Sequence, residues 1–322
     1  MVQLPLILSS IRSIGHHILR CKTTSLRTPI RSMADAVDVQ VVAVCQMTST
    51  DDKAANMKTV SWLVERAAKL GAKMVFLPEA FDYIAKDKQQ GLAMVETRTG
   101  PTLSRCAELA KQHGVWLSLG AFHEKDSSNA SKMLLTHVVL NTEGDIMASY
   151  NKSHLFDVEF GGNESLKESS HLTPGSSITP PVQTPVGKVG LAICYDVRFP
   201  ELSLCLRQQG AEILTYPSAF MSRTGMAHWE VLLRARAIEN QCYVIGAAQT
   251  GKHNDKRQSY GRAMIVDPWG SIIASCHEGV DVCIANVDLK YLQKVRQDMP
   301  VWNHRRYDLY GDVTKCMTEP TQ

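Results

Sequence analysis

Three apolar segments of the sequence are each followed by a side chain that can take part in hydrolysis. Glu79 follows the run KMVFLP, Lys152 follows residues 145–151, and Cys194 follows residues 188–193. Because α/β folds place their sites at the carboxyl ends of strands, we expect these three side chains to meet. Each of these side chains alone is more often structural. Together, the carboxylate, the amine and the thiol supply the base, the cation and the nucleophile that amide hydrolysis needs.

This set predicts cleavage of an amide through a covalent thioester. Cys194 attacks the carbonyl carbon, while Glu79 takes the thiol proton and later gives it to the leaving amine. Lys152 and the backbone N–H of Tyr195 stabilise the oxyanion. Glu79 then deprotonates the water that hydrolyses the thioester. A cation beside the sulfur is also expected to favour the thiolate.

The elements that must carry these residues alternate between strand and helix. We expect strands at 39–47, 73–78, 115–122, 134–141, 145–151, 188–194, 212–217 and 242–248, a hairpin over 260–277, and helices at 51–70, 102–113, 200–209 and 228–239. The alternation occurs in two halves that each end in antiparallel strands, which predicts an α/β fold of two sheets with helices outside. No linker separates the halves, so we expect one domain, with its most mobile segment at 157–175.

Three blocks of the sequence resemble the nitrilase, or carbon–nitrogen hydrolase, superfamily. They are LPEAF at 77–81, YNKSHL at 150–155 and CYDVRFPE at 194–201, and the resemblance covers about residues 38–315. It implies a hydrolase domain at 37–318 with a four-layer α-β-β-α sandwich that forms a homodimer. Within the superfamily the chain is similar to the nitrilase-homologue branch, as further blocks indicate: YPSAF at 216–220, HWE at 228–230, RARA at 234–237 and DPWG at 267–270.

The resemblance also implies a second active-site glutamate in the loop after the lysine. Counting back from Pro174 and Gly175, Glu168 matches best, and Glu164 and Glu159 are the runners-up. Its role would be to orient the lysine. Substrate contacts are expected from Phe81, Phe156, Arg198, Ser218, His228 and Trp229. An ion pair of Arg198 with Glu201, and packing or capping by His228 and Trp229, remain open as structural alternatives.

The three reactive side chains could also hydrate a nitrile, but the branch resemblance implies an amide substrate. The implied substrate is glutathione whose glutamyl amino group has become a keto group, cleaved to 2-oxoglutarate and cysteinylglycine as metabolite repair. An ω-amidase that acts on 2-oxoglutaramate shares the same acyl half, and the motifs do not separate the two. The difference is expected in the room for the leaving peptide, near 156–172 and 218–228.

Composition bounds the other classes of function. A formal net charge of +3 is too small to indicate nucleic acid as the main partner. No stretch approaches the roughly 20 apolar residues of a membrane helix. Nine scattered cysteines without a C-x-x-C pair indicate neither a disulfide framework nor a zinc site, and no H-E-x-x-H motif supports a metal-dependent hydrolase. We therefore expect no metal and no cofactor.

A binding or signalling module on a hydrolase fold is the alternative of another class. The presence of the three reactive residues counts against binding as the only role. The family resemblance also implies an association with a fragile-histidine-triad hydrolase.

The first 34 residues differ in composition from the rest of the chain. Residues 1–34 hold no acidic residue, many hydroxyl groups, isoleucines and leucines near helical spacing, and the basic residues Arg12, Arg20, Lys22, Arg27 and Arg31. This pattern is typical of a mitochondrial presequence. We expect mitochondrial targeting, together with a cytoplasmic form if synthesis also starts at Met33.

Overall fold

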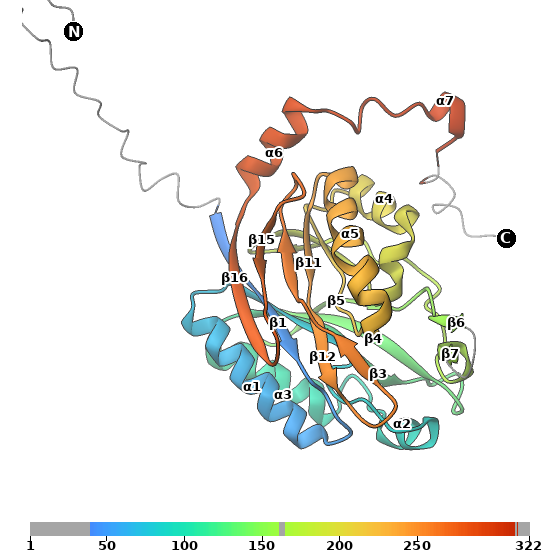
Figure 1. Cartoon of the computed structure of the whole chain (residues 1–322). Helices are drawn as coiled ribbons and strands as arrows, with labels where there is room; N and C mark the ends of the chain where they lie inside the picture. The colour runs from blue at the N-terminus through green and yellow to red at the C-terminus, as the bar shows by residue number, and fades with distance from the viewer. Residues whose placement is uncertain (1–38, 161–164, 313, 315–322) are drawn as a thin grey trace, which may run out of the picture. The chain divides into compact units, whose positions relative to one another are not determined.

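Two β-sheets face each other in the computed structural model, which describes residues 39–160, 165–312 and 314 (Figure 1). One sheet is covered on its outer face by α1 (Lys53–Lys69) and α3 (Pro101–His113), and the other by α4 (Pro200–Gln208) and α5 (Ser222–Asn240). This is the four-layer α-β-β-α sandwich that the sequence predicts. The expected presequence, residues 1–34, lies outside the described residues.

The larger sheet has eight strands in the order β13-β12-β1-β2-β3-β4-β5, and β16 pairs with β1. Because β1, β2 and β3 are parallel, their carboxyl ends lie at one edge of the sheet. Glu79 emerges at this edge. The strands are β1 (Val39–Met47), β2 (Met74–Glu79), β3 (Trp116–Lys125), β4 (Met133–Leu140), β5 (Ile146–Asn151), β12 (Ala248–Lys252), β13 (Gln258–Tyr260) and β16 (Asp281–Asp288).

The smaller sheet has six strands in the order β15-β14-β11-β10-β9-β8. Its centre is also parallel, since β10 pairs in parallel with both β9 and β11. Its strands are β8 (Val182–Thr184), β9 (Gly187–Leu191), β10 (Ile213–Thr215), β11 (Tyr243–Gly246), β14 (Met264–Val266) and β15 (Ile272–Ser275). The remaining described helices are α2 (Lys88–Met94), α6 (Leu289–Asp298) and α7 (Tyr307–Tyr310).

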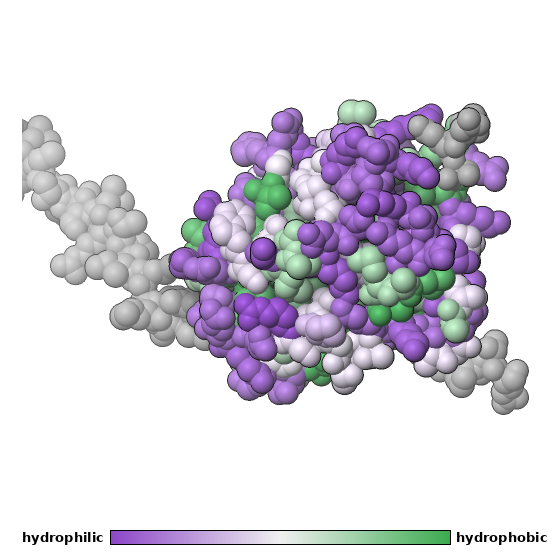
Figure 2. All heavy atoms as spheres, turned by 90° about the horizontal axis from the view of Figure 1, so that it is seen from below, coloured by the Kyte–Doolittle hydropathy of each residue, from purple (hydrophilic) through white to green (hydrophobic). Residues whose placement is uncertain are grey.

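Alternate residues of the central strands enter two separate hydrophobic clusters. In β1, Val42 and Val44 pack between the two sheets, whereas Ala43 and Cys45 pack under α1 and α3. This follows from the period of two in a strand, and it explains why the run is apolar on both faces. Seen from below, on the side where α1 and α2 lie in Figure 1, the surface is largely hydrophilic (Figure 2). No described helix is both long and apolar enough to cross a membrane.

Two local expectations are wrong. Helix α5 begins at Ser222 instead of residue 228, because the apolar period that marked its start does not extend into 222–227. Strand β9 ends at Leu191, and Cys194 opens a 3-10 turn instead of ending the strand. The segment 157–175, expected to be the most mobile, contains an antiparallel pair, β6 (Asp157–Glu159) and β7 (Ser165–Lys167), whose strands are too short to show a period.

Candidate active site

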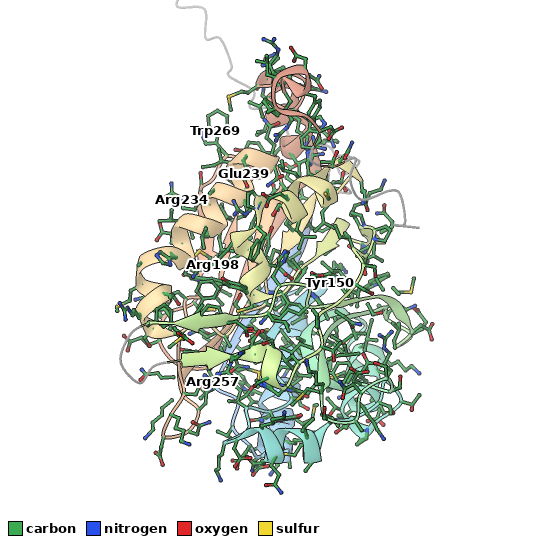
Figure 3. The ribbon with its side chains drawn as sticks, turned by 90° about the vertical axis from the view of Figure 1, so that its right-hand side faces the viewer. Tyr150, Arg198, Arg234, Glu239, Arg257 and Trp269 are labelled. Carbon is green, nitrogen blue, oxygen red and sulfur yellow. The ribbon has the colours of Figure 1, made fainter. Side chains whose placement is uncertain are left out.

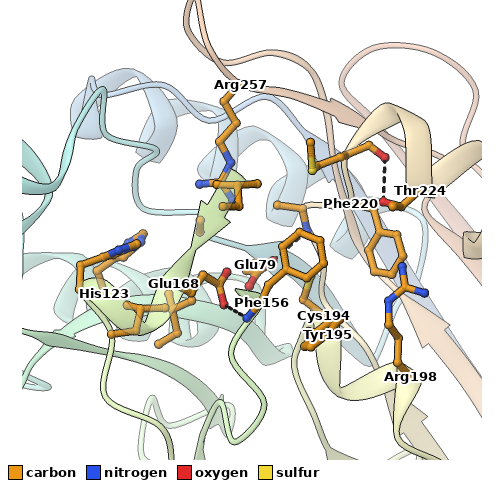
Figure 4. Close-up of a pocket in the computed structure, with 17 residues that line it drawn as sticks. Glu79, His123, Phe156, Glu168, Cys194, Tyr195, Arg198, Phe220, Thr224 and Arg257 are labelled. Carbon is orange, nitrogen blue, oxygen red and sulfur yellow. Dashed lines mark hydrogen bonds between the residues drawn. The ribbon is translucent and has the colours of Figure 1, made fainter. Parts of the chain in front are cut away.

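The three reactive side chains predicted from the sequence meet where the two sheets face each other. Glu79 is the last residue of β2 and Lys152 directly follows β5, both in the larger sheet, whereas Cys194 follows β9 of the smaller sheet. Lys152 and Glu79 are 1% and 2% exposed, and Cys194 is 9% exposed. The charged pair is therefore shielded from water while the sulfur still reaches a cavity (Figure 4).

The ammonium group of Lys152 lies between two carboxylates. Its Nζ is 2.8 Å from Oε1 of Glu79 and 2.9 Å from Oε2 of Glu168. Burial alone would lower the pKa of Lys152, but the charges of Glu168 and Glu79 hold this pKa well above its usual value. The lysine is therefore a fixed cation, as stabilisation of an oxyanion requires.

Several contacts fix the carboxyl group of Glu79. The backbone N–H of Ala219 donates to Oε2 at 2.9 Å, and Gln249 donates from Nε2 to the Glu79 carbonyl oxygen at 2.9 Å. Burial raises the pKa of Glu79, but Lys152 lowers it and the net shift is downward. The Cys194 thiol lies close enough to this carboxylate that it also lowers the pKa of Glu79. Glu79 is thus an ionised base beside the thiol.

Cys194 occupies a strained backbone conformation. Its φ angle is 47°, in the left-handed region that non-glycine residues seldom adopt, and its N–H donates to the Pro217 carbonyl at 2.9 Å. Burial and the charge of Glu79 raise the pKa of the Cys194 thiol, and the lysine offsets only part of this. Lys152 thus lowers the thiol pKa, as expected, but does not outweigh burial and Glu79. Glu79 therefore removes the thiol proton as attack begins.

Asp196 braces the turn that carries the nucleophile. Its Oδ2 accepts from the Ile193 N–H at 2.8 Å and from the Tyr150 hydroxyl at 2.9 Å, and its Oδ1 lies 2.7 Å from Nδ1 of His154. This buried carboxylate thereby connects the Cys194 turn to the end of β5, where the lysine begins.

The N–H of Tyr195 lies in the first turn of the 3-10 helix. Its neighbours Cys194 and Asp196 already donate their amides to the carbonyls of Pro217 and Ile193, at 2.9 and 3.0 Å. Unlike its two neighbours, the Tyr195 amide donates no hydrogen bond among the described residues, which is compatible with the expected role as an oxyanion donor.

Of the two candidate loop glutamates that the structure describes, Glu168 and Glu159, it is Glu168 whose carboxylate reaches Lys152. It begins a 3-10 turn after β7, and its Oε2 accepts from the Phe156 N–H at 2.8 Å. Glu159 is exposed on β6, and Glu164 lies outside the described residues. The Phe156 contact joins the second carboxylate to the β6 side of the loop, so the Lys152 environment depends on that loop.

A cavity of about 80 Å³ lies over Cys194, and a second cavity of about 590 Å³ adjoins it. Of the six expected substrate contacts, Phe156 and Arg198 line the inner cavity (Figure 4). Arg198 lies 5.4 Å from the centre of the Phe220 ring, and its guanidinium lies 3.2 Å from His228 Nδ1. In the described ion pairs and hydrogen bonds the partner of Arg198 is thus His228, and the pairing with Glu201 is not seen.

The other four expected contacts do not line either cavity. Phe81 is fully buried in the cluster under α1 and α3, and Ser218 donates its hydroxyl to the Tyr216 carbonyl. The indole of Trp229 donates to the Arg262 carbonyl at 2.7 Å inside the core. His228 is exposed and contacts the Arg198 guanidinium. The structure gives these residues packing and support contacts instead of places on the cavity wall.

Sequence reasoning missed other residues of the cavity wall, among them His123, His171 and Arg257. His123 directly follows the expected strand 115–122, so the rule that found Glu79 could also have found it. Arg257 lies in a polar hairpin between β12 and β13 with no periodic signal. No group of three or more histidine, cysteine or acidic side chains among the described residues is arranged to hold a metal ion.

The profile of the carbon-nitrogen hydrolase family matches residues 41–297. The chain belongs to the carbon–nitrogen hydrolase family. Deaminated glutathione amidase of Mus musculus, a similar protein, is 53% identical over 303 residues, which cover 93% of this chain and 94% of that protein. The nitrilase and fragile histidine triad fusion protein NitFhit of Caenorhabditis elegans is 51% identical over 84% of this chain and 61% of that protein.

Solved structures of carbon–nitrogen hydrolases share the fold. The crystal structure of C. elegans NitFhit matches with a TM-score of 0.82 at 50% identity, over 85% of this chain and 66% of that chain. Nit3 of Saccharomyces cerevisiae, a member of branch 10 of the nitrilase superfamily, matches with a TM-score of 0.74 at 32% identity, over 84% of this chain and 97% of that chain. The resemblance found in the sequence motifs is confirmed.

Proposed function

We propose that this protein is an amidase that cleaves the side-chain amide of deaminated glutathione to 2-oxoglutarate and cysteinylglycine. One observation carries the chemistry: a buried ammonium held by two carboxylates lies beside a thiol that reaches a cavity. The substrate is supported by the 53% identity to the mouse deaminated glutathione amidase over nearly the whole chain.

The proposed reaction passes through a thioester on Cys194. Glu79 accepts the thiol proton as the sulfur attacks the amide carbon, and the carbonyl oxygen becomes an oxyanion beside Lys152 and the Tyr195 N–H. When the C–N bond breaks, Glu79 gives the proton to the departing amine. Glu79 next deprotonates a water, which hydrolyses the thioester and restores the thiol. Glu168 holds Lys152 in place throughout.

The acyl half of the substrate carries a carboxylate next to its keto group. Arg198 lines the inner cavity and has no carboxylate partner among the described ion pairs, since its hydrogen-bond partner is His228. We assign it to this carboxylate, because guanidinium groups bind carboxylates with charge-assisted hydrogen bonds. Phe156 and Tyr195 form apolar walls for the methylene carbons.

The test compares deaminated glutathione and 2-oxoglutaramate as substrates of the purified protein. We expect a higher kcat/KM for deaminated glutathione, and a reversed ratio would make the protein an ω-amidase. Cys194→Ala should abolish turnover of both. Activity should survive a chelator and be lost with iodoacetamide, and the opposite pattern would indicate a metal-dependent hydrolase. A pull-down with Cys194→Ala separates a binding role from catalysis.

We also propose that the protein forms a homodimer through α5 and the turn between β14 and β15. Met226 and Val231 on α5 are 72% and 67% exposed, and Trp269 in the turn is 57% exposed. Figure 3 shows Trp269 above Arg234 on this side of the molecule. Exposed apolar side chains of this size mark interaction surfaces. Sedimentation should give a dimer, and Val231→Glu should shift it toward monomer.

Two proposals concern partners and location. NitFhit joins a similar chain to a fragile histidine triad domain, which supports an association with such a hydrolase. Co-purification of this protein with a separately expressed hydrolase of that kind tests the association.

The composition of residues 1–34 supports a mitochondrial form, and Met33 supports a cytoplasmic one. Fractionation of cells that express the full chain, or a Met33→Leu variant, tests both. The variant should remain only in mitochondria.

A further inference from the structure

The larger cavity opens beside the reactive sulfur but does not contain it. Five residues line both cavities: His123, Leu166, His171, Met221 and Arg257. Glu79 and Cys194 line only the inner one. The volume of the outer cavity is about 590 Å³ and that of the inner cavity about 80 Å³, so most of the room for a bulky substrate lies in the outer cavity.

The wall of the outer cavity is strongly cationic. Lys86, Lys88, Lys256 and Arg257 line it against a single acid, Asp87. A cavity lined by one sign of charge concentrates ligands of the opposite sign. The outer cavity is therefore suited to an anionic group.

Most of the polar side chains at this wall have protein partners. Lys86 pairs with Asp51 at 2.7 Å, Lys88 donates to the Ser170 carbonyl at 2.7 Å, and Asp87 caps α2. Arg257 has no ion pair with a carboxylate in the part of the chain that the structure describes. Lys256 also has no ion pair among the described residues, but it lines only the outer cavity. Arg257 is the lysine or arginine in the lining that lies at the boundary of the two cavities.

Arg257 and Arg198 approach the reactive centre from opposite sides. In Figure 4 the two side chains lie on either side of Cys194, and in Figure 3 strands β6 and β7 lie between them. Arg198 lines only the inner cavity, whereas Arg257 lines both. The pKa of Glu79, which burial raises and Lys152 lowers, is lowered further by the charge of Arg257. Arg257 therefore lies near the base that protonates the leaving amine, at the boundary of the cavity that holds Glu79 and Cys194.

Deaminated glutathione carries one carboxylate on each side of its scissile amide, beside the keto group and at the glycine end. We propose that the outer cavity is the leaving-group subsite and that Arg257 binds the glycine carboxylate of the departing cysteinylglycine. This assignment rests on the proposed function and deepens it. The 2-oxoglutaramate molecule releases ammonia and leaves the subsite empty, so Arg257 determines the preference for the peptide over simple ω-amides.

The test measures kcat/KM of Arg257→Gln with both substrates. Any effect through Glu79 is shared by both substrates, whereas loss of the charge-assisted hydrogen bond should lower the ratio of kcat/KM for deaminated glutathione to that for 2-oxoglutaramate roughly 10- to 100-fold. Arg257→Lys keeps the charge and should recover part of the loss. An analogue of deaminated glutathione that ends in glycinamide should lose as much with the wild-type protein, and the two losses should not add.

Lys252→Gln is the matched control, because Lys252 is an exposed cation of the same hairpin, pairs with Asp255 and lines neither cavity. It should behave as wild type with both substrates. An equal loss on both substrates in Arg257→Gln would overturn the subsite, since it would indicate an effect on Glu79 alone. An unchanged value for deaminated glutathione would overturn it as well.

A wild-type protein that cleaves 2-oxoglutaramate but not deaminated glutathione would refute the proposed function without deciding the subsite. In that case cysteinylglycine is tested as an inhibitor of 2-oxoglutaramate hydrolysis. The subsite predicts inhibition that Arg257→Gln weakens and Lys252→Gln does not. Inhibition that is absent, or equal in the two variants, would overturn the subsite.

Discussion

Glu79 and Ala219 lie 140 positions apart in the chain, yet the Ala219 N–H donates a 2.9 Å hydrogen bond to Oε2 of Glu79. Glu79 ends a strand of the larger sheet, and Ala219 follows β10 of the smaller sheet. The orientation of the base therefore depends on how closely the two sheets pack. Changes at the sheet interface should alter catalysis even when they contact no substrate.

Gly120→Ala tests this dependence. A Cβ at Gly120 would lie 2.1 Å from the Leu77 carbonyl oxygen on the neighbouring strand and 2.4 Å from the Pro217 Cβ, which follows β10 of the other sheet, so both β2 and the facing sheet would have to move away. We expect a loss of about 1–3 kcal/mol in unfolding free energy and a lower kcat, measured by urea unfolding and steady-state kinetics. Gly91→Ala, whose Cβ would meet the flexible end of Met133, is the control. Equal behaviour of the two variants would contradict the argument.

Lys152→Ala should lower kcat/KM by roughly 10² to 10³ or more, because it removes the cation at the oxyanion. The pH profile should also change. Glu79 acts as a base in its ionised form, so activity is present above its pKa and lost as pH falls through it. Lys152 holds this pKa below the usual glutamate value, and its removal should move the acid limb to higher pH.

The pH dependence of kcat/KM measures this shift, with Lys58→Ala on the exposed side of α1 as the control. A near-wild-type rate in Lys152→Ala would show that the lysine does not stabilise the oxyanion. A normal rate with a shifted pH profile would show that Lys152 acts only by lowering the pKa of Glu79.

Glu168→Gln keeps the size of the side chain but removes one of the two charges that hold Lys152. We expect the pKa of Lys152 to fall and kcat to decrease while the fold is retained, because the amide oxygen can still accept from Phe156. Glu159→Gln, on exposed β6, should leave kcat unchanged. Steady-state kinetics of the two variants decide whether kcat depends on the charge of Glu168 itself or changes with any loss of charge in this loop.

His137 should make the protein sensitive to acid. It lies between the sheets, 2.7 Å from the Ser118 hydroxyl and 3.2 Å from the Ala192 carbonyl, and burial lowers its pKa to about 4. The unfolded chain binds a proton near pH 6.5 and the folded chain does not, so stability falls as pH decreases from about 6.5 to 4. The loss is roughly 3 kcal/mol.

Urea unfolding across this pH range measures the effect. His137→Gln should reduce the slope over that window without abolishing it, because burial also lowers the pKa of His171 and His253 to about 4. His113→Gln at the end of α3 should retain the full slope. A slope that is the same in His137→Gln and wild type would assign the acid sensitivity to other buried groups.

The positions of the reactive residues were predictable because they follow a simple rule. Glu79 ends β2 and Lys152 directly follows β5. Strand β2 was visible in the sequence as an unbroken apolar run, because both of its faces are buried. Glu168 could be placed by counting back from Pro174 and Gly175. Its contact with Lys152 depends on the loop between β6 and β7, whose short strands carry no periodic signal.

The remaining wall of the site could not be predicted, for reasons that differ by residue. Arg257 lies in a polar hairpin where any charged residue reads as solvated. Trp229 and Phe81 belong to the family motifs, yet packing against the core, and not the motif, decides where their side chains lie. The pKa of the Cys194 thiol depends on its burial as well as on the charges of Glu79 and Lys152, and the relative size of these effects cannot be read from the sequence.

The site draws its base and its cation from one sheet and its nucleophile from the other. A chain that has formed either sheet alone has no competent site. During refolding, turnover should therefore return only after the two layers dock, later than the recovery of secondary structure. The time at which product formation recovers therefore reports when the two sheets have docked, the last step of folding.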